Sequence, residues 1–287
     1  MALNTAGHGG GILDDLRAKK LAFGRKNPDT LSRFCFGRLR EIRKDGLDGA
    51  RVMEYGAGFL MAEPLIYSLF KARSIDAVDY YSILRKRVLK DYVLEHNWEN
   101  ALGYATQFYG KEWTANWYRN LMSSVRTNTS NWWENLGIRY LAPYDVLRDK
   151  SQNKYDMILS SSTLEHVPPQ EAQPITKALA DKLDEGGVMY HYIHLEDHRD
   201  MQNNPFAFLS AQSDYRENDF DIRGNRLRIS DWKRIFHTLD GFEIKEYPHE
   251  IRKDVHLPSK IDNAFSDYSE EDLKSSHYTV QVTKISN

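Results

Sequence analysis

The sequence is poor in cysteine, in long apolar runs and in net charge. Cys35 is its one cysteine. It cannot form an intramolecular disulfide, which fits a reducing compartment, and we interpret it as a small core residue rather than a nucleophile. No apolar run approaches the roughly 18 residues of a membrane span, and the start MALNTAGHGGG lacks the apolar core of a signal peptide. We therefore expect a cytoplasmic protein without a membrane partner.

The formal net charge of -2 is spread over interspersed residues of both signs. Such a surface has no broad positive footprint for a phosphate backbone, so we expect no nucleic-acid partner. The 287 residues, 41% of them hydrophobic, are enough to bury a substantial core. The oligomeric state stays open, with a homodimer as one option.

Strand-like and helix-like segments alternate along the chain, which predicts an α/β fold with a Rossmann-like, doubly wound and mostly parallel sheet. The last two strand-like segments predict an antiparallel pair at one edge. The expected strands cover 50–55, 74–80, 138–142, 155–162, 188–195, 241–247 and 277–284, and the main expected helices cover 62–72, 171–183 and 230–238.

We expect a tail and helices over 1–45, with helix-like spacing at 12–24 and 30–44, and one main domain over 46–287. Two long insertions interrupt that domain, a helical cap at about 82–137 and a second segment at about 196–229; stretches of this length are usually functional lids or helical insertions. Five of the six tryptophans lie in the first insertion. They are either packing anchors or, for one or two such as Trp117, part of a substrate pocket.

The stretch RVMEYGAGFL predicts a buried strand that runs into a glycine turn. Gly56 and Gly58 permit unusual dihedral angles and close backbone approach, and the next helix points its N-terminus at the ligand. Asp79, about 20 residues on, is placed to accept hydrogen bonds from a ribose diol. The third glycine of a dinucleotide fingerprint is missing, because Met61 stands there. This absence weakens an NAD interpretation.

Glu54 stands two residues before the turn, and with Gly56 and Gly58 it makes the chain resemble the class I S-adenosylmethionine-dependent methyltransferases. In that family such an acidic residue helps hold the ammonium group of the methionine moiety, and Leu60 departs from the usual third glycine. The resemblance continues through YDMILSSSTLEHVP, residues 155–168. It implies the following cofactor residues: Glu54, Tyr55, Gly56, Ala57, Gly58, Asp79, Tyr80, Tyr144, Asp145, Ser160 and Ser161. Glu165 and His166 recur in the family at the start of a helix, and we assign them a structural role.

The richest polar cluster is HYIHLEDHRD, residues 191–200. Strand alternation places His194, Glu196 and His198 on one side, and His191 and Asp197 on the other. Three ligands on one strand are a poor tetrahedral cage, and no second ligand motif is evident, so we predict no metal. The catalytic candidates are a general base at His194 or His198, with Asp197 orienting the imidazole; plain loop hydrogen bonding is the alternative.

The segment NRLRISDW resembles one found in bacterial methyltransferases that act on saccharides or specialised metabolites. Arg226 and Arg228 are candidates for clamping an anionic substrate group, although surface arginines before a helix explain them equally well. We predict a methyltransferase that uses S-adenosylmethionine to modify an oxygen or nitrogen of a small-molecule acceptor. The alternatives are a catalytically inactive methyltransferase-like scaffold and a nucleotide-sugar or NAD-dependent enzyme.

Overall fold

Seven strands form a mixed sheet in the computed structural model, in the hydrogen-bonded order β3-β2-β1-β4-β5-β7-β6. The structure describes residues 19, 27–42, 46–127 and 129–285. β7 is antiparallel to both β5 and the edge strand β6. The predicted doubly wound sheet with an antiparallel pair at its edge is confirmed. The strands are β1 (Arg51–Tyr55), β2 (Ser74–Val78), β3 (Ile138–Leu141), β4 (Tyr155–Ser161), β5 (Leu183–His194), β6 (Phe242–Glu246) and β7 (His277–Lys284).

The chain divides into two compact units, and this division differs from the predicted tail and single domain. The N-terminal unit holds the described residues up to Asp145 together with Asn153–Ile158. The C-terminal unit holds Val146–Gln152 and the described residues from Leu159 onward. The expected first helix at 12–24 lies outside the described residues apart from Lys19.

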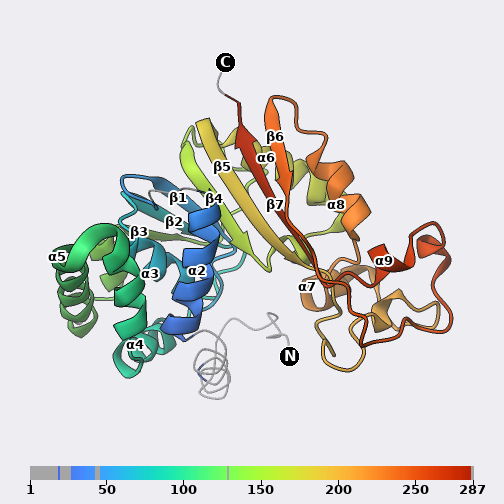
Figure 1. Cartoon of the computed structure of the whole chain (residues 1–287), viewed down its shortest axis with the longest axis horizontal. Helices are drawn as coiled ribbons and strands as arrows, with labels where there is room; N and C mark the ends of the chain where they lie inside the picture. The colour runs from blue at the N-terminus through green and yellow to red at the C-terminus, as the bar shows by residue number, and fades with distance from the viewer. Residues whose placement is uncertain (1–18, 20–26, 43–45, 128, 286–287) are drawn as a thin grey trace. The chain divides into compact units, whose positions relative to one another are not determined.

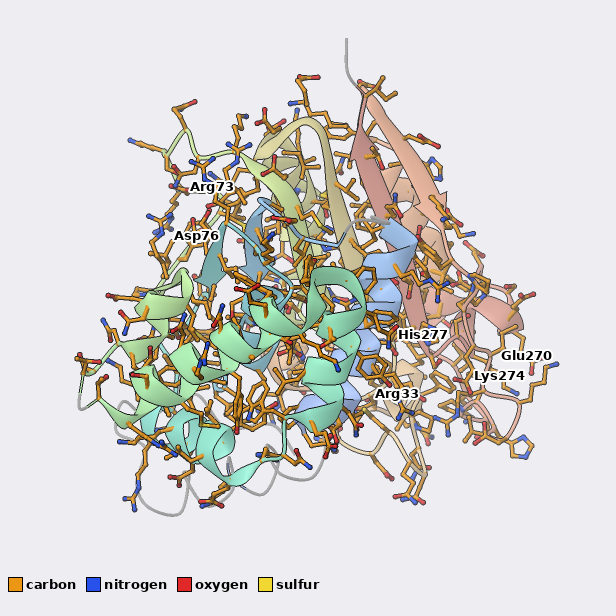
Figure 2. The ribbon with its side chains drawn as sticks, turned by 60° about the vertical axis from the view of Figure 1, so that its left-hand side comes forward. Arg33, Arg73, Asp76, Glu270, Lys274 and His277 are labelled. Carbon is orange, nitrogen blue, oxygen red and sulfur yellow. The ribbon has the colours of Figure 1, made fainter. Side chains whose placement is uncertain are left out.

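In the N-terminal unit, β1 pairs in parallel with β2, and β2 pairs in parallel with β3. Four of the five residues of both β1 and β2 are buried, as expected for strands that helices cover on both faces. Asp76 of β2 is a charged residue among these buried positions (Figure 2). Its carboxylate accepts two hydrogen bonds of 2.7 Å from Arg139 and one of 2.7 Å from the Tyr155 hydroxyl, which satisfy its charge. The helices of this unit are α2 (Pro28–Ile42), α3 (Ala62–Leu69), α4 (Lys86–Glu95) and α5 (Glu99–Arg126), with the 3₁₀ turn η1 (Trp132–Leu136).

The first insertion is helical, as predicted, and consists of α4, α5 and η1. Figure 1 shows the long α5, in green, beside α3 and α4. A kink interrupts α5 at Gly110, whose φ of 76° is in the left-handed region that favours glycine. Trp98, Trp117, Trp132 and Trp133 are all buried. This burial favours the interpretation of the tryptophans as packing anchors.

In the C-terminal unit, β5 and β7 form the longest pairing, from Val188↔Thr283 to His194↔His277. α6 and α8 contact each other, and α8, in orange in Figure 1, packs on β7. No helix among the described residues is long and apolar enough to cross a membrane. The helices here are α6 (Ala172–Asp181), α7 (Phe220–Arg223), α8 (Ile229–Phe236) and α9 (Glu270–Leu273), and the 3₁₀ turns are η2 (Leu164–His166), η3 (Pro169–Glu171), η4 (Ala207–Leu209), η5 (Glu217–Asp219) and η6 (Asn263–Phe265).

Candidate functional site

The glycine turn after β1 is tied to the end of β2. The N–H groups of Gly56 and Ala57 donate to the Val78 carbonyl at 2.9 and 3.0 Å. The N–H of Gly58 donates to Asp79 Oδ2 at 2.8 Å. Gly56 and Gly58 have φ values of 88° and 68°, which L-residues rarely adopt. The turn and Asp79, which the sequence predicted at one ligand site, are thus joined by a direct hydrogen bond, whereas the predicted contact of Asp79 with a ribose stays a prediction.

A third left-handed residue in this turn is Met61, with φ 47° and ψ 37°. This conformation costs an L-residue roughly 1–2 kcal/mol, which the full burial of the Met61 side chain helps to offset. The turn thus keeps a third left-handed position although the sequence lacks the glycine. A Cβ added at Gly58 would meet no atom within 4 Å, so open space lies beside that residue.

Asp79 is 8% exposed and holds several strand ends together. Its Oδ1 accepts a hydrogen bond of 3.1 Å from the Tyr81 N–H. Its backbone carbonyl accepts one of 2.8 Å from the N–H of Tyr144, the residue before the half-buried Asp145. Asp79 is thus a buried carboxylate at the edge of the turn, and its use for ribose hydroxyls stays a prediction. Tyr80 is 59% exposed and stacks edge-on against Tyr81.

Glu54 lies in a buried polar cluster of the N-terminal unit. It is 2% exposed, and the preceding helix contributes the equally buried Arg38. Burial and then the charge of Glu54 raise the pKa of the Tyr67 hydroxyl well above its usual value, while Arg38 opposes them. Burial likewise raises the pKa of Cys35 to about 12, which fits its assignment to the core. Arg38 precedes Glu54 by sixteen residues on another element, so no local pattern identifies it.

Of the two serines that end β4, Ser160 faces the interior. Its hydroxyl is 2.7 Å from Nδ1 of His191, and both residues are fully buried. Ser161 is half-buried. This placement does not fit a cofactor contact for Ser160, and we assign that hydroxyl to the buried His191 pair instead.

At the end of β5 lie the polar residues that strand alternation predicted on one side, namely His194, Glu196 and His198. His194 Nε2 is 3.2 Å from Glu196 Oε2, and the rings of His194 and His198 are 5.1 Å apart. Arg252 donates to Oε1 of Glu196. Arg252 follows Glu196 by 56 residues, and nothing local in the sequence connects them.

Both histidines are neutral near pH 7. Burial, followed by the nearby His277, lowers the pKa of His194 to about 4. Burial also lowers the pKa of His198 to about 3. Nε2 of His194 faces Glu196, whereas Nδ1 is buried and has no hydrogen-bond partner among the described residues. His194 Nδ1 is therefore suited to accept a proton.

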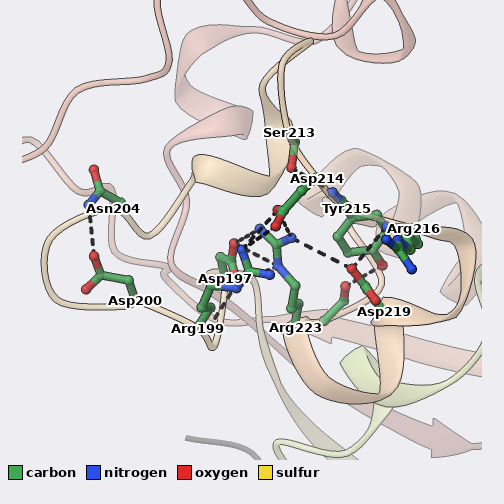
Figure 3. A network of polar contacts seen from close by, with 11 residues as sticks. Asp197, Arg199, Asp200, Asn204, Ser213, Asp214, Tyr215, Arg216, Asp219 and Arg223 are labelled. Atoms are coloured by element: carbon green, nitrogen blue, oxygen red, sulfur yellow. Dashed lines mark hydrogen bonds and ion pairs between the residues drawn. The ribbon is translucent and has the colours of Figure 1, made fainter.

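Asp197 has a different partner from the predicted imidazole. Its side chain is 1% exposed, and both its oxygens accept hydrogen bonds from Arg223 Nε at 3.1 Å (Figure 3). Asp214 also accepts from Arg223, and the N–H of Arg199 donates to Asp197. The carboxylate that contacts His194 is Glu196, so we assign Asp197 to holding this loop.

The three predicted substrate residues also have structural partners. Arg226 pairs with Asp262 at 3.2 Å and lies over the rings of Tyr215 and Phe265. Arg228 is fully buried, and its guanidinium donates to backbone carbonyls of Leu195, Asp272, Leu273 and Ser275. Trp117 Nε1 donates to Ser68 Oγ at 3.1 Å, and its ring packs on Trp98. These contacts do not fit a substrate clamp, and we do not propose one at these residues.

Comparisons with known proteins place the chain beside methyltransferases. No protein-family model and no curated protein matches it. Similar solved structures include the magnesium protoporphyrin IX methyltransferase of Synechocystis PCC 6803 with bound S-adenosylhomocysteine, at a TM-score of 0.46 and 12% identity over 97% of this chain and 89% of that one. An O-methyltransferase family protein of Burkholderia thailandensis has a TM-score of 0.45 and 11% identity over 96% of this chain and 61% of that one. These similarities concern the fold alone, so the chemistry of this chain has to be argued from its own residues.

Proposed function

We propose that this chain transfers a methyl group from S-adenosylmethionine to an oxygen or nitrogen of a small molecule, such as a saccharide or specialised metabolite. The observation that carries the proposal is the glycine turn whose Gly58 N–H is bonded to the buried Asp79 carboxylate. S-adenosylmethionine, when bound, supplies a methyl group on a positively charged sulfur. Orientation of two reactants can contribute roughly 7–11 kcal/mol, so binding residues carry most of the proposed task.

The residues of the N-terminal unit fit this cofactor. Open space beside Gly58 admits a ligand close to the backbone. Asp79 has the charge and position to accept hydrogen bonds from a ribose diol, and Glu54 has the charge to hold an ammonium group. Tyr144 and Asp145 follow β3 at the position where the family contacts adenine. A dinucleotide would add a pyrophosphate, which the negative charge of Glu54 just before the turn does not favour.

His194 is the proton acceptor that we propose for an acceptor hydroxyl or amine. Its Nε2 lies 3.2 Å from Glu196 Oε2, and its Nδ1, which has no hydrogen-bond partner among the described residues, is the candidate basic atom. A positioned base contributes about 10² to 10⁴ in rate, less than orientation does. A base with a pKa near 4 is weak, so its proton transfer must coincide with methyl transfer, when the acceptor becomes acidic.

Calorimetry tests the cofactor. We expect S-adenosylmethionine and S-adenosylhomocysteine to bind at one site, and NAD and nucleotide sugars not to bind. Tighter binding of NAD or of a nucleotide sugar would contradict the proposal. A panel of saccharides and small metabolites, incubated with methyl-labelled cofactor, then identifies the acceptor class. Cofactor binding without turnover over a broad panel would instead favour a methyltransferase-like scaffold.

A further inference from the structure

A second polar turn lies beside His198 within the C-terminal unit. The 3₁₀ turn η2 carries Glu165 and His166, for which the sequence pattern predicts a structural role. One ligand atom each from Glu165, His166 and His198 lie within 4.8 Å of one another. Glu165 Oε1 is 3.9 Å from His198 Nε2, and the two imidazole rings are 4.8 Å apart. The turn thus supplies the second ligand motif whose absence argued against a metal.

Glu165 is a buried acid that has no lysine or arginine partner among the described residues. It is 1% exposed, and neither carboxylate oxygen has a hydrogen-bond partner within normal distance and angle in that part of the chain, although the Ser162 side chain and the backbone of Glu165 and His194 lie near enough to oppose the effect of burial on its pKa. Within that part of the chain its ion-pair contact is His198, which is neutral near pH 7. Buried polar groups are nearly always bonded, and a bound cation would give this carboxyl group the charged partner that it lacks among the described residues.

The two imidazoles are in the form that binds metals. An imidazole with the ordinary pKa near 6.5 is mostly neutral at pH 7 and above, so each ring keeps one lone pair for a metal ion. His166 Nδ1 is 3.2 Å from the Phe220 carbonyl, and as donor it leaves Nε2 as the ligand atom. Metal-binding histidines usually donate their other N–H to a carbonyl or carboxylate in this way.

The short segment 223–225 holds the backbone of both the η2 turn and His198. Asn225 Nδ2 donates to the carbonyls of Leu164 and Val167 at 2.9 and 3.1 Å, and the Asn225 N–H donates to the Glu165 carbonyl at 2.7 Å. The His198 N–H donates to the Arg223 carbonyl at 3.2 Å. The ion pair of Arg223 with Asp197 anchors this segment in turn. The ligands are therefore held by their backbone before any ion arrives.

We propose that Glu165, His166 and His198 bind one divalent transition-metal ion with an open coordination position. Two imidazoles and one carboxylate form the donor set of catalytic zinc and non-haem iron sites. Bonds near 2.1 Å at tetrahedral angles put ligand atoms about 3.4 Å apart, so shifts on the order of an ångström close the site. An acceptor hydroxyl at the open position would lose its proton more readily; that use rests on the proposed function, whereas ion binding does not.

Zinc titration of the tag-free, chelator-treated full chain tests the site. We expect one Zn²⁺ per chain by calorimetry, and visible Co²⁺ absorption when cobalt replaces it. Glu165→Gln and His198→Gln should each weaken Zn²⁺ binding at least tenfold. His237→Gln is the matched control, because His237 is an exposed imidazole of the same unit that pairs with Glu246, and its affinity should be unchanged.

Glu165→Gln also tests whether a loss of Zn²⁺ binding is caused by misfolding. Glutamine resembles a protonated glutamate in shape, so the metal-free variant should melt at or above the wild-type Tm, while the rise in Tm on adding Zn²⁺ disappears. Equal Zn²⁺ affinity in wild type and Glu165→Gln, or no Co²⁺ absorption, would overturn the metal site. S-adenosylhomocysteine binding measured on the same samples keeps that outcome separate from failure of the proposed function.

Discussion

At the scale of single residues, Asp79 has two tasks, since it fixes the Gly58 turn and is our candidate for the ribose. We expect Asp79→Ala to weaken S-adenosylhomocysteine binding at least tenfold, because charge-assisted hydrogen bonds of about 1.5–3 kcal/mol are lost. Calorimetry measures the affinity. Asp76→Asn is the control, because Asp76 is a buried acid of β2, the strand that ends just before Asp79, and its partners are Arg139 and Tyr155. Unchanged affinity in folded Asp79→Ala would remove Asp79 from the site.

His194 gives a residue-scale prediction with a pH signature. His194→Gln should lower kcat about 10²-fold and leave cofactor affinity unchanged, because the base acts only in the chemical step. Burial lowers the pKa of His194 to about 4, so its basic form persists in acid. The wild-type kcat/KM should therefore stay level from pH 8 to about 5 and fall only as the pH nears 4. A fall centred near pH 6.5 would show that another group is the base.

The sequence predicted which residues lie on one face of a strand better than it predicted what each residue binds. The sequence placed His194, Glu196 and His198 on one face because alternation is a local property of a strand. It could not choose between Glu196 and Asp197 as the partner of an imidazole, because that choice depends on Arg223 and Arg252, which come from distant segments. Arg228 looked like a surface arginine because its partners also come from distant segments. Its burial depends on carbonyls of residues 272–275.

At the scale of elements, most strands and helices follow from local pattern. Buried apolar runs predicted β1, β2 and β4, and turn residues separated them from their helices. The stretch after β4 differs from expectation, since Glu165 and His166 form a 3₁₀ turn before α6 begins at Ala172. Asn225 sets this turn by bonding the carbonyls of Leu164 and Val167, a contact that sequence spacing does not encode.

Trp117 of α5 separates packing from substrate binding within the insertion. Trp117→Ala should lower the free energy of unfolding by about 3–5 kcal/mol, because a buried ring and its bond to Ser68 are lost. Chemical denaturation measures this effect. Leu94→Ala, at a 41% exposed position of α4, should change it by less than about 0.5 kcal/mol. A Trp117 variant of normal stability that fails to bind acceptor would restore the pocket interpretation.

At the scale of the whole molecule, the two compact units hold different chemistry. The N-terminal unit contains the glycine turn, Glu54 and Asp79, whereas the C-terminal unit contains the histidines and Glu165. Sequence pattern predicted the sheet but not this division, because the number of contacts that cross a boundary depends on packing rather than on local composition. Two compact units can unfold in separate steps, so thermal melts of this chain require more than one spectroscopic probe.

The buried titratable groups of the C-terminal unit predict how stability varies with pH in metal-free buffer. The pKa values of His194 and His198 in the folded chain, about 4 and 3, lie below the ordinary histidine value of 6.5. Between these values the unfolded chain binds more protons, so stability falls as the pH drops from 6.5 toward 4. Glu165 has the opposite sign: its pKa of about 8 in the folded chain exceeds the ordinary glutamate value of 4.5, so stability falls as the pH rises from 4.5 toward 8.

Stability should therefore be greatest near pH 6.5, with each shifted group contributing a slope of at most about 1.4 kcal/mol per pH unit. Thermal melts from pH 4 to 9 in the presence of a chelator measure this profile. Glu165→Gln should flatten the alkaline side and steepen the fall in stability between pH 6.5 and 4.5, where Glu165 opposes the two histidines, whereas His194→Gln combined with His198→Gln should remove the fall on the acid side. If Glu165→Gln leaves the decline between pH 6.5 and 8 unaltered, Glu165 is ionised in the folded chain, and a cationic partner must already hold it.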